Sequence, residues 1–326
     1  MNLEVQAGRI GGRYKIQLFD RNGLLTRETD WFDNLITNTG LDWYGSGVQD
    51  YHSSFSGYAP WGRCAVGTNN TPPTNTDTTL GTQLAVQPIY SANSQQPSGS
   101  VTYVAGPPAY FTTTTTFTYA LGAVVGNIAE IGVGCFPSTG GVPTPTTNLT
   151  LFSHALIQSG GSPTTISVTA ADQLVVTFEL RYYINTTDTP YSVTISGTGY
   201  TGTMRSSNQS LNFSFTLAGT NDSNAPGNNN TACTVYNGAL GPVTGLPTGS
   251  SSYIGQSTIP SYTAGTYTKS YTYNATTATG NLTGGISVIA VQSAFQVWQF
   301  SISPNIAKDN TKTMSLTFSY SWNRYP

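Results

Sequence analysis

Residues 174–183 read Leu174-Val-Val-Thr-Phe-Glu-Leu-Arg-Tyr-Tyr183, and this stretch decides the fold class. Its apolar and aromatic side chains stand at every second position: Leu174, Val176, Phe178, Leu180 and Tyr182. Successive side chains of a β-strand point to opposite faces, so this alternation predicts a long strand with one buried face. Such a strand is typical of a β-sandwich.

The pattern returns 140 residues further on, at Met314, Leu316, Phe318, Tyr320 and Trp322. Two interpretations stay open: the chain contains two related modules, or two unrelated amphipathic strands share a pattern that any such strand has. Between the two stretches, turn-forming residues cluster in Asn185-Thr-Thr-Asp-Thr-Pro190. We therefore predict two jelly-roll-like β-sandwich domains, an N-terminal attachment domain at 1–187 and a C-terminal domain at 188–326.

The composition also favours an all-β fold. Charged residues make up 8% of the chain, against roughly 25% in an average soluble protein. Threonine, tyrosine, valine and phenylalanine fit a half-buried strand, whereas glycine, asparagine and proline form turns. Aromatic residues make up 12% of the chain, and with the repeated alternation they predict an ordered structure.

The N-terminal region predicts a hairpin followed by the one helix of the fold. Residues 13–20 alternate, the dipeptide Asn22-Gly23 suits a type I′ turn, and residues 24–29 form the return strand. Asp33 can cap a short helix that runs to about Tyr44.

Two glycine-rich or polar tracts predict loops. The polar tract 218–252 has the composition of a long loop. The motif Gly197-Thr-Gly-Tyr-Thr-Gly202 predicts a turn in preference to a nucleotide-binding loop, because no amphipathic helix follows it.

The charge and cysteine patterns disfavour several classes of function. The formal net charge is −2 with four lysines in the chain, which leaves no basic stripe for nucleic acid. The first 19 residues lack the apolar core of a secretory signal, and no stretch has the ~20 apolar residues of a membrane-spanning helix. Cys64, Cys135 and Cys233 are far apart, so we expect buried free thiols in place of disulfides or a zinc site.

Residues with catalytic chemistry are few. His52 and His154 have no second ligand type at a metal-binding spacing, and we expect His154 to be an exposed or hydrogen-bonded strand residue. A glycan hydrolase needs two carboxylates beside its sugar, and the candidates are Glu130, Asp172, Glu179, Asp188 and Asp222. An ion pair with Arg181 explains Glu179, and a turn explains Asp172. We therefore predict no catalytic residue, no metal and no cofactor.

Aromatic residues are better candidates for contact with partners. Five tyrosines among serine, threonine and glycine can stack on a host glycan or, more simply, pack in the core: Tyr253, Tyr262, Tyr267, Tyr271 and Tyr273. Apolar residues are dense near the predicted helix, and we expect an attachment or oligomer contact at Trp31, Phe32, Leu35 and Trp43. Core packing is the competing explanation here as well.

Several segments, taken in their order along the chain, carry a family resemblance. They are Asp30-Trp-Phe-Asp-Asn-Leu-Ile-Thr-Asn-Thr-Gly-Leu41, Cys64-Ala-Val-Gly-Thr68 with Thr76-Asp-Thr-Thr-Leu80, Glu130-Ile-Gly-Val-Gly134, Leu151-Phe-Ser-His-Ala-Leu-Ile157 with the stretch to Tyr183, and the closing run from Ser303 to Trp322. In this order they resemble a family of tailed-bacteriophage virion proteins, described as tail fibre or tail-associated structural proteins. The resemblance implies a location in the virion and a binding or scaffolding role, with no catalytic residues to carry over.

We therefore expect a non-enzymatic structural component of a phage virion, a tail fibre or tail-associated protein that attaches by its N-terminal part and can contact the host. Its expected partners are itself, as a homo-oligomer with a trimer favoured, other virion proteins of the tail or capsid, and host surface glycan. Synthesis in the host cytoplasm and release by lysis explain a hydroxyl-rich surface without a secretory signal. The alternatives are a capsid decoration or cement protein, a glycan-binding adhesin and a depolymerase.

Overall fold

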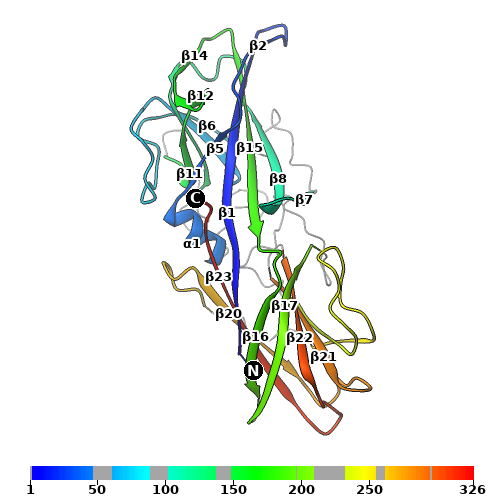
Figure 1. Cartoon of the computed structure of the whole chain (residues 1–326). Helices are drawn as coiled ribbons and strands as arrows, with labels where there is room; N and C mark the ends of the chain where they lie inside the picture. Colours follow the sequence, from blue (N-terminus) through cyan, green and yellow to red (C-terminus); the bar gives the residue numbers. More distant parts are fainter. Residues whose placement is uncertain are drawn as a thin grey trace.

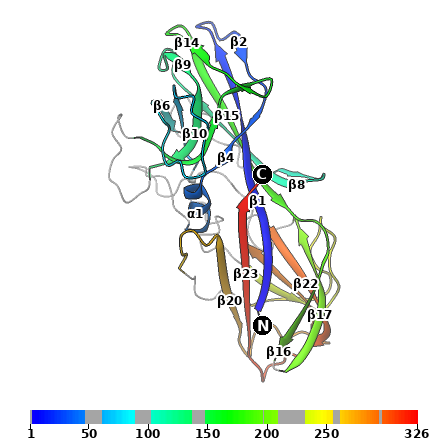
Figure 2. The same ribbon diagram turned by 60° about the vertical axis from the view of Figure 1, so that its left-hand side comes forward.

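The computed structural model describes residues 2–46, 61–88, 102–136, 148–195, 197–208, 232–254, 261–293 and 296–326. Strands hold 57% of the residues and helices 4%, which confirms the predicted all-β, sandwich-like fold with a short helix. Figures 1 and 2 show an elongated molecule with an upper and a lower lobe, joined at a waist.

The largest sheet has eight strands and runs through both lobes. Its order is β20 (Thr268–Ala275), β23 (Met314–Arg324), β1 (Asn2–Phe19), β15 (Gln173–Ile184), β8 (Ala109–Thr118) and β7 (Thr102–Val104), with β2 (Leu25–Glu28) and β3 (Phe32–Asp33) paired to β1.

Strand β1 belongs to both lobes. Its first half pairs in parallel with β23, and its second half pairs antiparallel with β15, with an irregularity in the β23 pairing between Gln6 and Arg9. Figure 1 shows β1 in blue, running from the lower lobe to the top of the upper lobe. The waist is the region where β1 changes its main partner.

The upper lobe is closed by a five-stranded sheet. Its order is β4 (Leu35–Ile36), β11 (Thr150–Leu156), β10 (Glu130–Cys135), β5 (Arg63–Gly67) and β6 (Gln83–Pro88), and two short pairs lie nearby, β9 (Gly126–Ile128) with β14 (Ile166–Val168) and β12 (Gln158–Ser159) with β13 (Ser162–Pro163). Tyr14 joins the layers: its ring lies 5.2 Å from that of Phe178, its hydroxyl is 2.6 Å from Ser153 Oγ, and it accepts a hydrogen bond from the amide of Val133.

The lower lobe is closed by a six-stranded sheet. Its order is β16 (Thr189–Ile195), β17 (Thr198–Ser207), β22 (Gln296–Ile306), β21 (Ile286–Ser293), β18 (Ala232–Tyr236) and β19 (Ser251–Tyr253). This sheet packs on β23, because the ring of Phe318 lies 5.5 Å from that of Trp298 and 5.8 Å from that of Phe300.

Both amphipathic stretches place their apolar faces as the sequence predicts. All five alternate residues from Leu174 to Tyr182 are buried, and so are the four from Leu316 to Trp322, while Met314 is half-buried. The chain leaves the eight-stranded sheet after Ile184, and β20 and β23 later return to it. Strands from both sides of residue 188 therefore share one sheet, and the division into two domains stays a prediction.

Helix α1 (Asn38–Ser46) lies at the waist, beside the end of the chain. The indole Nε1 of Trp322 donates to the carbonyl of Leu41, and Arg324 donates through Nε to the carbonyl of Ile36. With nine residues, α1 falls short of a membrane span, and the described ranges hold no other helix that reaches one.

The predicted start of the helix is wrong. Residues Phe32–Asp33 pair with β1 and Leu35–Ile36 pair with β11, so both segments are extended. The helix begins at Asn38 because Thr37 caps it: the hydroxyl of Thr37 accepts a hydrogen bond from the amide of Gly40 at 2.9 Å.

The predicted type I′ turn is also wrong. Such a turn needs positive φ at both central residues, but of Asn22 and Gly23 only Gly23 adopts it, with φ 78°. The carboxylate of Asp20 organises the turn in its place by accepting hydrogen bonds from the amides of Asn22 and Leu24.

Two expected loops contain strands. Gly197 does turn, with φ 82°, but the residues after it form β17. Glycine is required within this strand, because a Cβ at Gly202 would lie 1.8 Å from the carbonyl oxygen of Ser301. In the polar tract 218–252, residues 232–236 form β18 inside the sheet, and residues 218–231 lie outside the described part of the chain.

Candidate functional site

One row of side chains crosses four strands at the waist. Asn323 on β23 pairs with Arg9 on β1, Arg9 pairs with Tyr183 on β15, and Tyr183 pairs with Tyr110 on β8. Side chains at directly paired positions share a face of the sheet. The row therefore presents an amide, a guanidinium and two phenol rings side by side.

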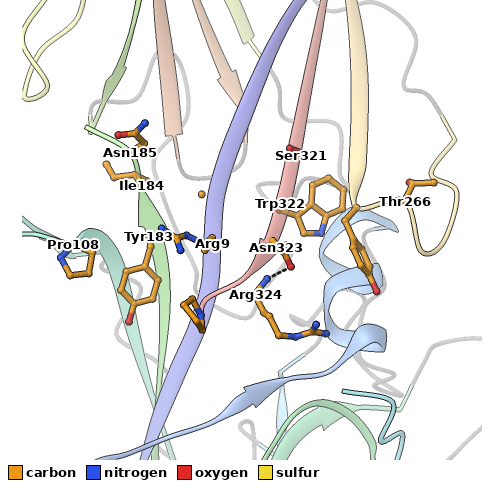
Figure 3. Close-up of a pocket in the computed structure, with 13 residues that line it drawn as sticks. Arg9, Pro108, Tyr183, Ile184, Asn185, Thr266, Ser321, Trp322, Asn323 and Arg324 are labelled. Carbon is orange, nitrogen blue, oxygen red and sulfur yellow. Dashed lines mark hydrogen bonds between the residues drawn. The ribbon is translucent and has the colours of Figure 1, made fainter. Parts of the chain in front are cut away.

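This row borders a hollow with a volume of about 920 Å³. A second hollow of about 210 Å³ shares Pro108, Tyr183 and Pro326 with it, and a third of about 540 Å³ shares Pro108, Ile184 and Asn185. The three hollows therefore adjoin, and together we call them the waist groove. Figure 3 shows Arg9 and Tyr183 on one side of β1, and Trp322 and Arg324 on the other.

Arginine and aromatic side chains are interleaved along the groove. The rings of Tyr183 and Tyr325 stack with centroids 3.7 Å apart, and the guanidinium of Arg9 lies 5.5 Å from the centroid of Tyr325. The guanidinium of Arg181 lies over Tyr110 at 4.7 Å. Burial raises the pKa of Tyr183 even though Arg181 opposes this effect, so the phenol stays protonated and can donate a hydrogen bond.

Tyr267, which lines the groove, has a strained backbone. Its φ of 50° makes it the one non-glycine residue of the described ranges with positive φ. The left-handed conformation costs a non-glycine residue about 1–2 kcal/mol. Its carbonyl accepts from the amide of Trp322 at 2.9 Å, and its amide donates to the hydroxyl of Tyr262 at 3.3 Å. Strain of this kind is concentrated at functional sites.

The five tyrosines predicted to contact glycan are not brought to one surface. Tyr271 and Tyr273 are 1% and 0% exposed, so their rings belong to the core of the lower lobe. Tyr253 is exposed on the edge strand β19, and Tyr262 is half-buried, with its hydroxyl 2.7 Å from Asp42 Oδ1. Of the five, Tyr267 lines the waist groove.

The four predicted attachment residues are also divided. Phe32 and Trp43 are buried in the core. Trp31 and Leu35 are half-buried, and the guanidinium of Arg13 lies 4.4 Å from the ring centroid of Trp31. Trp31 and Leu35 thus keep some surface for a partner, and the attachment role of all four stays a prediction.

A buried charge cluster in the upper lobe joins two residues that the sequence singled out. His154 on β11 contacts Asp77 through Nδ1 at 2.7 Å and Glu130 through Nε2 at 3.1 Å. Burial alone would lower the pKa of His154, but its hydrogen bonds to Glu130 and Asp77 outweigh burial and raise it. His154 is thus a hydrogen-bonded strand residue, which was one of its two predicted states.

This cluster predicts a pH-dependent stability. Because the pKa of His154 is raised in the folded state, its stabilising effect is complete below its ordinary value of 6.5 and is lost as pH rises through the folded value. Urea unfolding of the wild type between pH 6 and pH 8 should therefore show stability falling with pH, and His154→Gln should flatten this slope. Lys269, whose buried amine has its pKa lowered to about 8, also titrates near this range. Both proteins contain Lys269, so its effect cancels when their slopes are compared. Equal slopes in the two proteins would contradict the prediction.

The carboxylates considered for glycan hydrolysis are engaged elsewhere. Glu130 is buried, and Asp172 accepts a hydrogen bond from the amide of Thr169. Glu179 forms ion pairs with Arg13 and Arg181, and Asp188 forms one with Arg205. Asp222 and His52 lie outside the described residues. Within the described ranges no group of three or more histidine, cysteine, aspartate or glutamate side chains is arranged to hold a metal ion.

The cysteines match their prediction. Cys64, Cys135 and Cys233 are free and buried, and burial raises the pKa of Cys64 to about 12. A thiol in this state is a packing group with little reactivity.

No sequence pattern predicts the waist groove. Arg9, Tyr183 and Asn323 are more than 100 residues apart along the chain, and only the pairing of β1 with both β15 and β23 brings them together.

No family model, no curated protein and no solved structure matches this chain. The fold and the groove geometry are therefore the basis for any functional conclusion.

Proposed function

We propose that this chain is a non-enzymatic structural component of a phage virion, a tail fibre or tail-associated protein. The observation that supports this most is strand β1. Its 18 residues at about 3.3 Å per residue span roughly 60 Å, and it is hydrogen-bonded to neighbours in both lobes. Two sandwiches that share a strand resist bending more than two domains on a flexible linker, as a fibre segment requires.

Exposed apolar side chains support attachment through the N-terminal part. Leu24, at 66% the most exposed large apolar residue of the described ranges, lies in the turn between β1 and β2, and Leu25, Leu84, Leu121 and Val125 are also exposed in the upper lobe. Among exposed large apolar residues of the described ranges, only Tyr253 belongs to the lower lobe. We take this uneven distribution of exposed apolar side chains between the lobes as support for a partner contact on the upper lobe.

A structural role also agrees with the state of the acidic residues. A hydrolase needs two carboxylates placed on either side of its substrate. Asp33 is the one acidic side chain among the residues that line the waist groove, and the described carboxylates considered for hydrolysis are held in ion pairs, turns or a buried cluster. We therefore propose that the chain binds and supports without turning over a substrate.

Mass spectrometry of gradient-purified particles of the virus that encodes the chain tests the proposal. We expect peptides from both lobes at a fixed stoichiometry that survives washing in high salt, and antibody label on the tail in electron microscopy. Label on the shell would favour the capsid decoration alternative. Absence of the chain from washed particles that retain the other structural proteins would overturn the proposal.

A further inference from the structure

The waist groove is large enough for a ligand of several linked units. Its three adjoining hollows extend from the end of β23, across β1 and β15, to the segment before β8. The largest hollow, of about 920 Å³, is at the upper end of the ~300–1,000 Å³ typical of ligand sites. A ligand that filled all three would be an oligomer.

The charge of the groove suits an anion. Three arginines, Arg9, Arg181 and Arg324, line the hollows against one acidic side chain, Asp33. Arg181 pairs with Glu179, and Arg324 donates to the carbonyl of Ile36 and to Asn38 Oδ1. Arg9 is exposed, and the described part of the chain offers it ring contact but no hydrogen bond or ion pair. Its five donors are therefore available to a carboxylate, which a guanidinium can bind through two parallel hydrogen bonds.

The other groups of the groove suit a sugar. Asn185, Asn323 and Ser321 supply amides and a hydroxyl that both donate and accept hydrogen bonds, as sugar hydroxyls require. Tyr267 and Pro108 add flat apolar faces for the C–H side of a sugar ring. Hydrogen bonds from the amide of Trp322 and to the hydroxyl of Tyr262 hold the backbone of Tyr267 beside the groove, and a backbone fixed before binding lowers the ordering entropy that binding must overcome.

From these observations we propose that the waist groove binds a linear acidic glycan, with a sugar carboxylate at Arg9 and neighbouring sugar units in the adjoining hollows. A nucleic acid fits less well, because its regularly spaced phosphates require a stripe of several basic side chains, whereas the groove offers one available guanidinium. The inference rests on the host-contact part of the proposed function and names its ligand class. Because the test uses the purified chain, its failure would leave membership of the virion unaffected.

Isothermal titration calorimetry on the full chain tests the inference with three probes: a hexamer of galacturonic acid, a trimer of α2,8-linked sialic acid and neutral maltohexaose. We expect at least one acidic probe to bind at least ten-fold more tightly than maltohexaose. Arg9→Ala should weaken that binding by about ten-fold or more, as the loss of a charged hydrogen bond does. Tyr267→Gly, which keeps the backbone conformation without strain, should also weaken it.

Arg27→Ala is the matched control, because Arg27 is an exposed arginine on β2, outside the residues that line the groove. It should bind as the wild type does. Arg9→Ala is expected to fold, since the exposed side chain makes no hydrogen bond in the described ranges, and circular dichroism checks this. Absence of binding to both acidic probes, equal binding of neutral and acidic probes, or unchanged binding by Arg9→Ala would each overturn the inference.

Discussion

Replacement of Glu130 by alanine is expected to lower the free energy of unfolding by about 3–5 kcal/mol, the usual result of removing one partner from a buried ion pair. Glu130 is 1% exposed, and its carboxylate faces the imidazole of His154. It also accepts hydrogen bonds from the amides of Asn69 at 3.2 Å, Gly81 at 3.0 Å and Thr82 at 2.8 Å. Alanine would leave a buried imidazole and three amides short of an acceptor.

The same contacts explain why the effect should be large. The segment between β5 and β6 contains no strand, and Glu130 attaches it to the five-stranded sheet at three amides. Glu130→Gln keeps an acceptor oxygen but loses the charge. We therefore expect its free energy of unfolding to lie between those of the wild type and Glu130→Ala.

Urea denaturation at pH 7, followed by far-ultraviolet circular dichroism, measures the change. Glu28→Ala is the matched control, because Glu28 is an exposed glutamate that pairs with Lys15 at 2.8 Å on the surface. Surface pairs contribute little to stability, so this variant should unfold as the wild type does. Similar denaturation curves for Glu28→Ala and Glu130→Ala would show that the buried cluster is dispensable.

The upper-lobe cluster marks a limit of sequence-based prediction. Alternation identifies β15 and β23 because one face of each is almost fully buried, whereas the other face is mostly half-buried or exposed. Alternation is absent from β10, because all six of its residues are buried and the polar residue Glu130 is among them. A strand covered on both faces has no period of two to detect. Glu130 and His154 can each be noticed in the sequence, but their pairing depends on the register of β10 with β11.

Local signals were misleading where tertiary pairing decided the conformation. Asp33 has the residue type of a helix cap, yet the pairing of β3 with β1 holds it in a strand, and Thr37 takes the capping role. Gly202 has the residue type of a turn, yet it allows β17 to approach Ser301 closely. In both cases the chain context outweighs the preference of the single residue.

Replacement of Trp322 by alanine is the second change with a large expected effect. Trp322 is 3% exposed, and its ring lies 5.5 Å from that of Tyr44 on α1 and 5.6 Å from those of Tyr262 and Tyr320. Its indole also donates the hydrogen bond to Leu41 that attaches the helix to β23. Truncation of a buried tryptophan to alanine leaves a cavity and costs about 3–5 kcal/mol.

Trp31→Ala is the matched control for this change. Trp31 is half-buried, and the contact described for it is the guanidinium of Arg13 over its ring, an interaction of about 0.5–1 kcal/mol at exposed sites. Urea denaturation followed by circular dichroism should thus show a several-fold larger loss for Trp322→Ala. Trp31→Ala should stay folded, which makes it the variant for testing attachment to particles. Equal losses in the two variants would mean that the contact between α1 and β23 does not stabilise the waist, because the cavity and the lost hydrogen bond of Trp322→Ala would then have no measurable consequence.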